Sequence, residues 1–217
     1  MAHLLHVDSS ALSAGSVSKE IAVTFRKAWQ EAHPDGSVVH LDLGLEPVPP
    51  LAEAGITAPA VPTDAHTRAQ AEALAIRERL VNQVVDADAY LFAVPMYNWG
   101  IPAAFKAWID QIMLAGRTFT LGGPLPLAGR PATVILSYGG GYDPGTPRYG
   151  WDFVQPYLET VLGKAIGLDV TFIKAQLTLA EQVPAMADLI PAAREYRAAA
   201  HKGADAQARD VVAKLSA

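Results

Sequence analysis

Short runs of apolar residues alternate along the chain with longer segments in which apolar positions repeat with the period of an α-helix. Five apolar runs cover residues 4–7, 38–43, 89–94, 132–137 and 169–173. Helical periodicity covers residues 17–32, 67–85, 102–115 and 151–166, and much of 186–215. Strands that alternate with helices in this way are typical of a parallel sheet with helices on both faces. The pattern therefore predicts an α/β fold, a five-stranded parallel sheet in three αβα layers.

Two segments depart from this alternation. Residues 44–63 contain five prolines, which is too many for a regular element, and the segment is long for a structureless connection. We expect it to be a surface excursion that shapes a pocket or an interface. The alanine-rich C-terminal helix is expected to break near Pro191 and Gly203. Neither break implies a second domain, so residues 1–217 are predicted to form a single domain.

The chain has 217 residues, no cysteine, 51% hydrophobic residues and a formal net charge of -5. Without cysteine it has no disulfides, thiolate nucleophile or thiolate metal site, so any redox chemistry belongs to a bound cofactor. A mildly acidic balance without a dense basic cluster disfavours nucleic acid and anionic membranes as partners. No uncharged apolar stretch reaches the ~20 residues that span a bilayer. We expect a cytoplasmic protein with a small-molecule partner.

Charged and histidine residues give no sign of a catalytic or metal centre. His3 and His6 share the first strand at an odd separation, so their side chains face opposite sides of the sheet. The other histidines show no paired metal-ligand spacing, and the prediction is that the protein holds no metal. Arg77, Glu78 and Arg79 lie in a helical segment and are expected to form an exposed face.

The loop at residues 8–18, between the first strand and the first helix, is rich in hydroxyl groups. Unpaired amides at a helix N-terminus attract anions, and hydroxyls at Ser9, Ser16 and Ser18 donate to phosphate oxygens. The loop lacks the lysine motif of nucleoside triphosphate sites and the glycine motif of dinucleotide sites. It therefore favours a terminal monophosphate. The alternative is that Ser16 or Ser18 only caps the helix.

A second loop, residues 95–100, follows the third strand and carries two aromatic side chains and an amide. Tyr97 and Trp99 offer aromatic surfaces, and Asn98 both donates and accepts hydrogen bonds. These groups suit a planar ring that is half polar and half apolar, such as an isoalloxazine. Alternatively, the aromatic rings only fill a gap between the loop and the next helix.

A third loop, residues 137–143, follows the fourth strand and contains three glycines. Because the carboxyl ends of parallel strands share one edge of a sheet, it opens beside the other two loops. Glycine lets the main chain approach a ligand closely. The alternative is a glycine turn that contacts no ligand.

With these three loops in view, the chain resembles the FMN-dependent NAD(P)H azoreductases and quinone reductases of the flavodoxin-like superfamily. The resemblance covers essentially the whole chain and lies mainly in three blocks, namely Ser9 with residues 16–18, residues 95–110 with 116–119, and Ser137 with residues 139–140. It implies a flavodoxin-like sheet, noncovalent FMN and a homodimer with the flavin near the subunit boundary. It also implies two-electron, ping-pong hydride transfer from NADH or NADPH to a quinone or an azo compound.

Carried over to this chain, the resemblance implies these cofactor-binding residues: Ser9, Ser10, Ser16, Val17, Ser18, Pro95, Met96, Tyr97, Asn98, Trp99, Ser137, Tyr138, Gly139 and Gly140. It implies that Trp99, Phe119 and Tyr142 line the substrate, with Phe119 reaching across the dimer boundary. No ionisable catalytic residue is needed, because the flavin carries the chemistry. Trp99, Tyr138 and Tyr142 depart from residues common in the family, which affects substrate range.

Two other functions stay open on the sequence. A flavodoxin-type electron carrier also binds FMN but passes single electrons to protein partners. A protein of the same fold with a vestigial flavin site would act through protein contacts alone.

Overall fold

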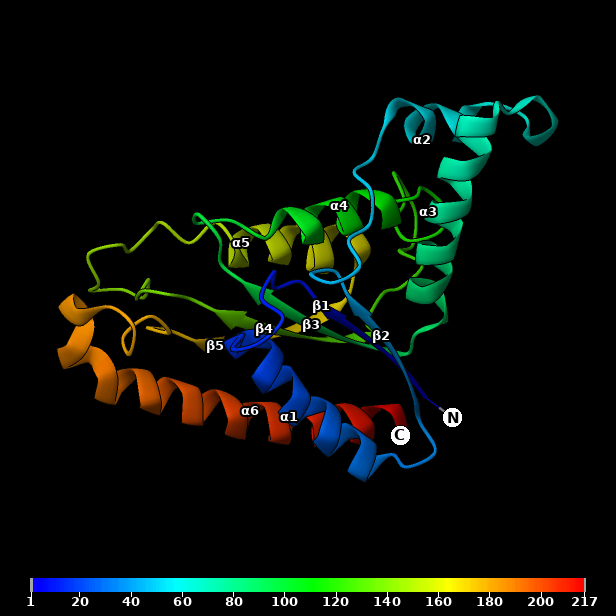
Figure 1. Cartoon of the computed structure of the whole chain (residues 1–217). Helices are drawn as coiled ribbons and strands as arrows, with labels where there is room; N and C mark the ends of the chain where they lie inside the picture. The colour runs from blue at the N-terminus through cyan, green and yellow to red at the C-terminus, as the bar shows by residue number, and fades with distance from the viewer. Residues whose placement is uncertain (1, 217) are drawn as a thin grey trace.

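The computed structural model describes residues 2–216 and contains one five-stranded sheet in which all strands are parallel, in the order β2-β1-β3-β4-β5 (Figure 1). The strands are β1 (His3–Asp8), β2 (Ser37–Asp42), β3 (Ala89–Pro95), β4 (Pro131–Ser137) and β5 (Asp169–Ala175). Each lies within a few residues of its predicted position. The predicted fold class is therefore confirmed.

Helices cover both faces of the sheet (Figure 1). The α-helices are α1 (Val17–Ala32), α2 (Glu53–Thr57), α3 (Arg68–Asp86), α4 (Ala103–Ile112), α5 (Gln155–Leu158) and α6 (Ile190–Ser216). The 3-10 helices η1 (Ala58–Ala60), η2 (Thr63–Ala65) and η4 (Pro184–Leu189) and the π-helix η3 (Glu159–Ile166) complete the set. Helices α1 and α6 lie on one face, and α3, α4 and α5 lie on the other. Within the described residues, no helix is long and apolar enough to cross a membrane.

The core has two parts, one on each face of the sheet. Every residue of β3 and β4 is buried, which explains why these strands read as continuous apolar runs. Phe25 and Trp29 of α1 fill the core on one face. On the other face, Phe105 and Trp108 of α4 stack with ring centroids 5.5 Å apart.

Two segments contain more helix than the sequence predicts, namely the C-terminal helix around Gly203 and the proline-rich residues 44–63. Helix α6 continues through Gly203 instead of breaking there. A Cβ at Gly203 would make an ordinary van der Waals contact with Ile173 of β5 at 3.8 Å, so the helix packs against the sheet here without strain. The proline-rich excursion at residues 44–63 also holds α2 and η1, since its prolines avoid the interior of α2.

Helix α5 begins later than the periodicity predicts. Residues 151–154 are not α-helical, because the Asp152 carboxylate accepts hydrogen bonds from the main-chain amides of Val154 and Gln155. A short polar side chain that bonds to nearby amides in this way favours a helix start after it. The helix then widens into the π-helix η3, which ends at Gly167 with a positive φ of 91°.

Arg77 corrects the prediction of an exposed charged face. Its side chain is buried, and its guanidinium donates three hydrogen bonds to main-chain carbonyls. The acceptors are Gln111 at 3.2 Å and Met113 at 2.8 Å, at the end of α4, and Gly55 of α2 at 2.8 Å. A fixed cation suits the negative end of a helix dipole, so Arg77 joins α2, α3 and α4.

Replacing Arg77 with methionine should lower the free energy of unfolding by about 2–4 kcal/mol, because three buried carbonyls lose their donor. Urea denaturation followed by circular dichroism measures this loss. The matched control is Arg79→Met two residues along the same helix, where the exposed side chain should matter by less than about 0.5 kcal/mol. Equal losses in both variants would contradict the role given to Arg77.

Candidate functional site

The loops after β1, β3, β4 and β5 meet at the carboxyl edge of the sheet. They enclose two adjoining hollows of about 250 and 210 Å³, which share Met96, Gly139 and Leu179 and are here called the cleft. Together the hollows fall in the size range of small-molecule sites, roughly 300–1,000 Å³. All the predicted cofactor residues line the cleft except Ser9, Ser18 and Tyr138.

The first loop presents a helix N-terminus to the cleft. Ser16 is the N-cap of α1, and its hydroxyl accepts a hydrogen bond from the amide of Lys19. The first main-chain bond of the helix runs from Glu20 N to Ser16 O. The amides of Val17 and Ser18 precede this bond and have no partner within the helix. Ser16 thus caps α1, and the amide of Val17, a residue that lines the cleft, is left for an anion.

Ser9 and Ser18 are predicted cofactor residues, but the structure does not place them in the lining of the cleft. The Ser9 hydroxyl donates to the carbonyl of Ala93 on β3 at 2.8 Å, and its side chain is buried. Ser18 is fully buried, with its Oγ 3.3 Å from that of Ser16. Pairing with β3 and the close packing of the first turn of α1 hold both hydroxyls inside the protein.

The second loop is a tight hairpin. Tyr97 and Gly100 exchange two main-chain hydrogen bonds, of 3.0 and 3.1 Å. The two residues between them, Asn98 and Trp99, both have positive φ, 50° and 65°. This is the type I′ pattern, which asparagine tolerates and a bulky residue such as tryptophan rarely adopts. Backbone strain of this kind, about 1–3 kcal/mol per residue, is concentrated at functional sites.

Tyr97 connects the first loop to the second. Its hydroxyl lies 3.1 Å from the Ser10 hydroxyl and accepts a hydrogen bond from the main-chain amide of Ala11 at 3.1 Å. On the far side of the hairpin, Trp99 packs edge-on against Trp151 with ring centroids 5.7 Å apart. The hairpin is therefore held from both sides.

In the third loop, the structure turns the side chain of Tyr138 away from the cleft. The ring is fully buried, and its hydroxyl donates to Asp152 at 2.9 Å. Burial and the neighbouring Asp152 carboxylate raise the pKa of Tyr138 far above its usual range. Its main-chain groups bond to Ala175 and Thr178. The aromatic ring of Tyr138 thus packs into the core, although it stands in a glycine-rich loop. The sequence prediction treated Tyr138 only as a cofactor residue.

Gly139 and Gly140 do line the cleft, and space is scarce at both. A Cβ at Gly139 would lie 2.7 Å from Leu179, and one at Gly140 would lie 3.1 Å from the guanidinium of Arg148. Of the predicted substrate-lining residues, Trp99 and Tyr142 reach the cleft. Phe119 of the same chain does not line it, and its predicted place across a dimer boundary stays a prediction.

Sequence reasoning missed several cleft residues. They are Leu12, Gly15, Arg148, Thr178, Leu179 and Gln182. The last three follow β5, so their position after a fifth parallel strand was the signal that could have found them. Two larger hollows, of about 450 and 500 Å³, flank β2 and α3 and contain none of the predicted cofactor residues.

Residues 2–200 match the model of a family described as having a flavodoxin-like fold. The chain belongs to this family. It is 46% identical to the FMN-dependent NADH:quinone oxidoreductase of Streptomyces avermitilis over 100% of both chains, and 43% identical to that of Streptomyces coelicolor over 100% of this chain and 98% of the relative. An azoreductase crystal structure from Bacillus anthracis superposes with a TM-score of 0.83 at 25% identity, covering 97% of this chain and all of the other.

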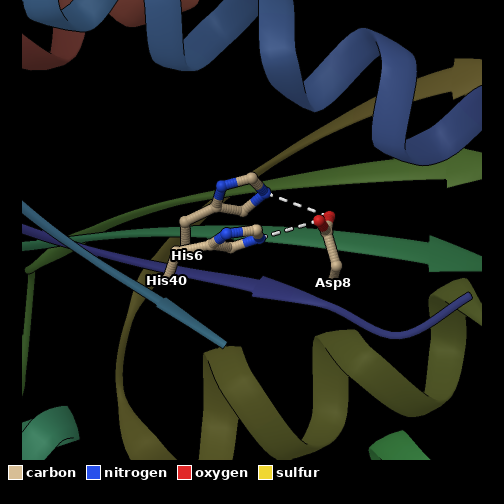
Figure 2. Close-up of side chains that lie close together, drawn as sticks. All are labelled: His6, Asp8 and His40. Carbon is tan, nitrogen blue, oxygen red and sulfur yellow. Dashed lines mark hydrogen bonds and ion pairs between the residues drawn. The ribbon is translucent and has the colours of Figure 1, made fainter. Parts of the chain in front are cut away.

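Beside the cleft, the sheet assembles a polar cluster that the sequence did not indicate, in which His6 and Asp8 are buried and His40 is exposed. His6 of β1 and His40 of β2 are paired in register, and their rings stack with centroids 4.4 Å apart. Their Nε2 atoms lie 3.0 and 2.8 Å from the two oxygens of Asp8, as Figure 2 shows. We call this group the His–Asp–His clamp. It lies directly before Ser9 and Ser10 of the first loop.

The clamp brings three candidate metal ligands within 4.8 Å of one another, although no sequence spacing announced them. A metal on both Nε2 atoms would put a proton on Nδ1 of His6, which is buried and has no hydrogen-bond partner within the described residues. If the proton of His6 is on Nε2 instead, it is donated to Asp8. Nδ1 is then an acceptor without a partner, which costs less than a buried N–H donor without one. The geometry therefore favours a hydrogen-bonded clamp.

Burial lowers the pKa of His6, outweighing the Asp8 carboxylate, which raises it. Burial alone would raise the pKa of Asp8, but hydrogen bonds from His40 and His6 bring it below its usual range. Both groups therefore bind protons less readily in the folded chain than in the unfolded chain. Acid then favours unfolding, first through His6 below about pH 6.5 and then through Asp8 below about pH 4.

Replacing His6 with asparagine should flatten the fall in unfolding free energy between pH 7 and pH 5. A single group of this kind contributes a slope of up to about 1.4 kcal/mol per pH unit. Urea denaturation at a series of pH values gives the slope, whatever the absolute stability of the variant. The wild-type chain, measured over the same pH series, is the reference for the slope. A wild-type slope in His6→Asn would refute the clamp's protonation state.

Proposed function

We propose that this chain is an FMN-dependent NADH:quinone oxidoreductase that also reduces aromatic azo compounds. One observation carries the proposal: loops from four strands form one cleft, in a chain that matches an enzyme of that name along its whole length. The proposed acceptors are quinones and azo compounds, and the proposed donor is NADH. We place the enzyme in the cytoplasm, where reduced nicotinamide nucleotides are available.

The first loop suits the FMN phosphate. The amide of Val17 and the hydroxyls of Ser10 and Ser16 belong to residues that line the cleft, and they supply donors without adding charge. The nearby Lys19 is already paired with Asp42, at 2.7 Å. A dianionic phosphate would therefore be held mainly by the helix dipole and neutral hydrogen bonds.

The second and third loops suit the flavin ring. Met96, Trp99 and Tyr142 present apolar surface, while Asn98 and the Gly139–Gly140 main chain present polar groups. Only glycine fits at position 139, because a Cβ there would lie 2.7 Å from Leu179, and so the main chain itself forms this wall of the cleft. In the part of the chain that the structure describes, no aspartate or glutamate lines the cleft, so negative charge on a bound ring meets no carboxylate at the cleft wall.

FMN held by these three loops would supply the two-electron redox chemistry that connects NADH with the acceptor. The chain's own contribution is to hold the reactants and to orient them. The strained hairpin fixes its amides relative to the first loop through Tyr97, and Trp99 offers a surface on which planar substrates stack. Preorganised donors of this kind favour the charged form of a reduced ring without reorganising.

We also propose that two copies form a homodimer around the cleft. Large apolar side chains stand exposed beside it: Trp99 is 43% exposed, Trp151 50% and Phe153 63%. Exposed apolar groups that gather in one place are typical of an interface. In such a dimer, Phe119 would complete the substrate side of the partner's cleft.

The proposed activity predicts the visible spectrum of the protein reconstituted with FMN under anaerobic conditions. NADH should bleach the bound flavin, and a quinone or azo compound should then restore the oxidised spectrum. A parallel sample receives NADPH in place of NADH. Flavin that binds but stays oxidised with both nucleotides would favour an electron carrier. Failure to retain flavin would favour a vestigial site, and both results would overturn the proposal.

Replacing Tyr97 with phenylalanine should raise the dissociation constant of FMN about fivefold, because the first two loops lose a bridge worth about 1 kcal/mol. Quenching of FMN fluorescence on binding to the apoprotein gives the constant. Tyr196→Phe, at an exposed site on α6, is the control and should bind FMN as the wild type does. An unchanged constant in Tyr97→Phe would show that the bridge does not organise the site.

The dimer proposal predicts a sedimenting mass of twice the 23.0 kDa chain. Phe119→Ala should leave that mass unchanged and lower kcat/KM for quinones, if Phe119 serves the partner's cleft. A monomer at micromolar concentration would refute the dimer. An unaffected kcat/KM would refute the placement of Phe119.

A further inference from the structure

Among residues 2–216, Arg148 is the only one with a charged side chain that lines the cleft. It belongs to the long segment between β4 and α5, and no sequence motif singles it out. Its guanidinium lies against the main chain of Gly140, since a Cβ there would be 3.1 Å from Nη1. Glycine at position 140 thus gives the cation room to reach the wall of the cleft.

Hydrogen bonds hold the segment that carries Arg148 beside the strained hairpin. Arg148 and Trp151 are the ends of one turn, closed by a bond from Trp151 N to Arg148 O at 3.1 Å. Phe153 N then donates to Trp99 O at 3.3 Å, and the Trp151 ring packs edge-on against Trp99. The Arg148 cation and the Trp99 ring therefore lie together on one rim of the cleft, and Trp151 packs against Trp99.

No ion pair neutralises Arg148 within the part of the chain that the structure describes. The two acidic residues of its own segment are engaged elsewhere. Asp143 pairs with the Gln176 amide, and Asp152 binds Tyr138 and the start of α5. The guanidinium remains available, and its planar fork matches a carboxylate or a sulfonate.

We propose that Arg148 is a specificity-determining residue that selects planar aromatic acceptors carrying an anionic group. This inference rests on the proposed function and names the substrate class of the same cleft. Trp99 offers its ring to the aromatic part of the acceptor, and Arg148 pairs with the anion beside it. In the reduction itself, a quinone gains a hydride derived from NADH and one proton from water, giving a hydroquinone and NAD⁺. Arg148 exchanges no proton in this reaction.

The experiment compares 1,4-naphthoquinone-2-sulfonate with 1,4-naphthoquinone in the FMN-loaded enzyme. The ratio of their kcat/KM values should fall about tenfold in Arg148→Gln, the effect of losing one charge-assisted hydrogen bond. Arg148→Lys should recover part of the ratio. Arg68→Gln, at an exposed site on α3, is the matched control and should keep the wild-type ratio.

A second readout avoids turnover. Naphthalene-2-sulfonate accepts no hydride, and calorimetry should show its dissociation constant rise about tenfold in Arg148→Gln. An unchanged ratio, or an equal loss with both quinones, would overturn the inference, and so would loss of FMN from the variant. A wild-type enzyme that reduces neither quinone would instead refute the proposed function, while calorimetry would still test the anion site.

Discussion

Strands β3 and β4 are buried along their whole length, and the arrangement of the rest of the chain depends on this burial. A parallel strand is always entered from the same end of the sheet, so the chain must return across one face after each strand. The returning helices cover both faces of the central strands. Each strand then ends at the same edge, where the loops after β1, β3, β4 and β5 form the cleft.

In the described residues, the cleft combines neutral hydrogen-bonding groups with one cation, Arg148. Hydroxyls and helix amides line the end at α1, and aromatic rings with Arg148 line the end at the hairpin. The left-handed backbone at Asn98 and Trp99 is costly, and it is stable because bonds from the first loop and from Phe153 hold the hairpin on both sides. Strain in one loop is thus sustained by contacts with two others.

Outside the cleft, buried polar groups join elements that are far apart in the sequence. Arg77 reaches carbonyls of α2 and α4, and Asp8 holds histidines from β1 and β2. A buried charge needs such partners, because desolvation costs several kcal/mol when it is not compensated. The clamp therefore braces the end of β1, from which the first loop departs.

The sequence by itself determined the α/β class, the five strands and the three loops at one edge, because apolar periodicity reports which faces of each element are buried. Only the tertiary structure decided which side chains enter the cleft. Ser9 and Tyr138 look like ligand residues by position, yet each finds a partner inside the protein. Arg77 reads as exposed yet is buried, and His6 meets His40 only because β1 and β2 pair in register. Periodicity is a local property, whereas a hydrogen-bond partner is supplied by a distant part of the chain.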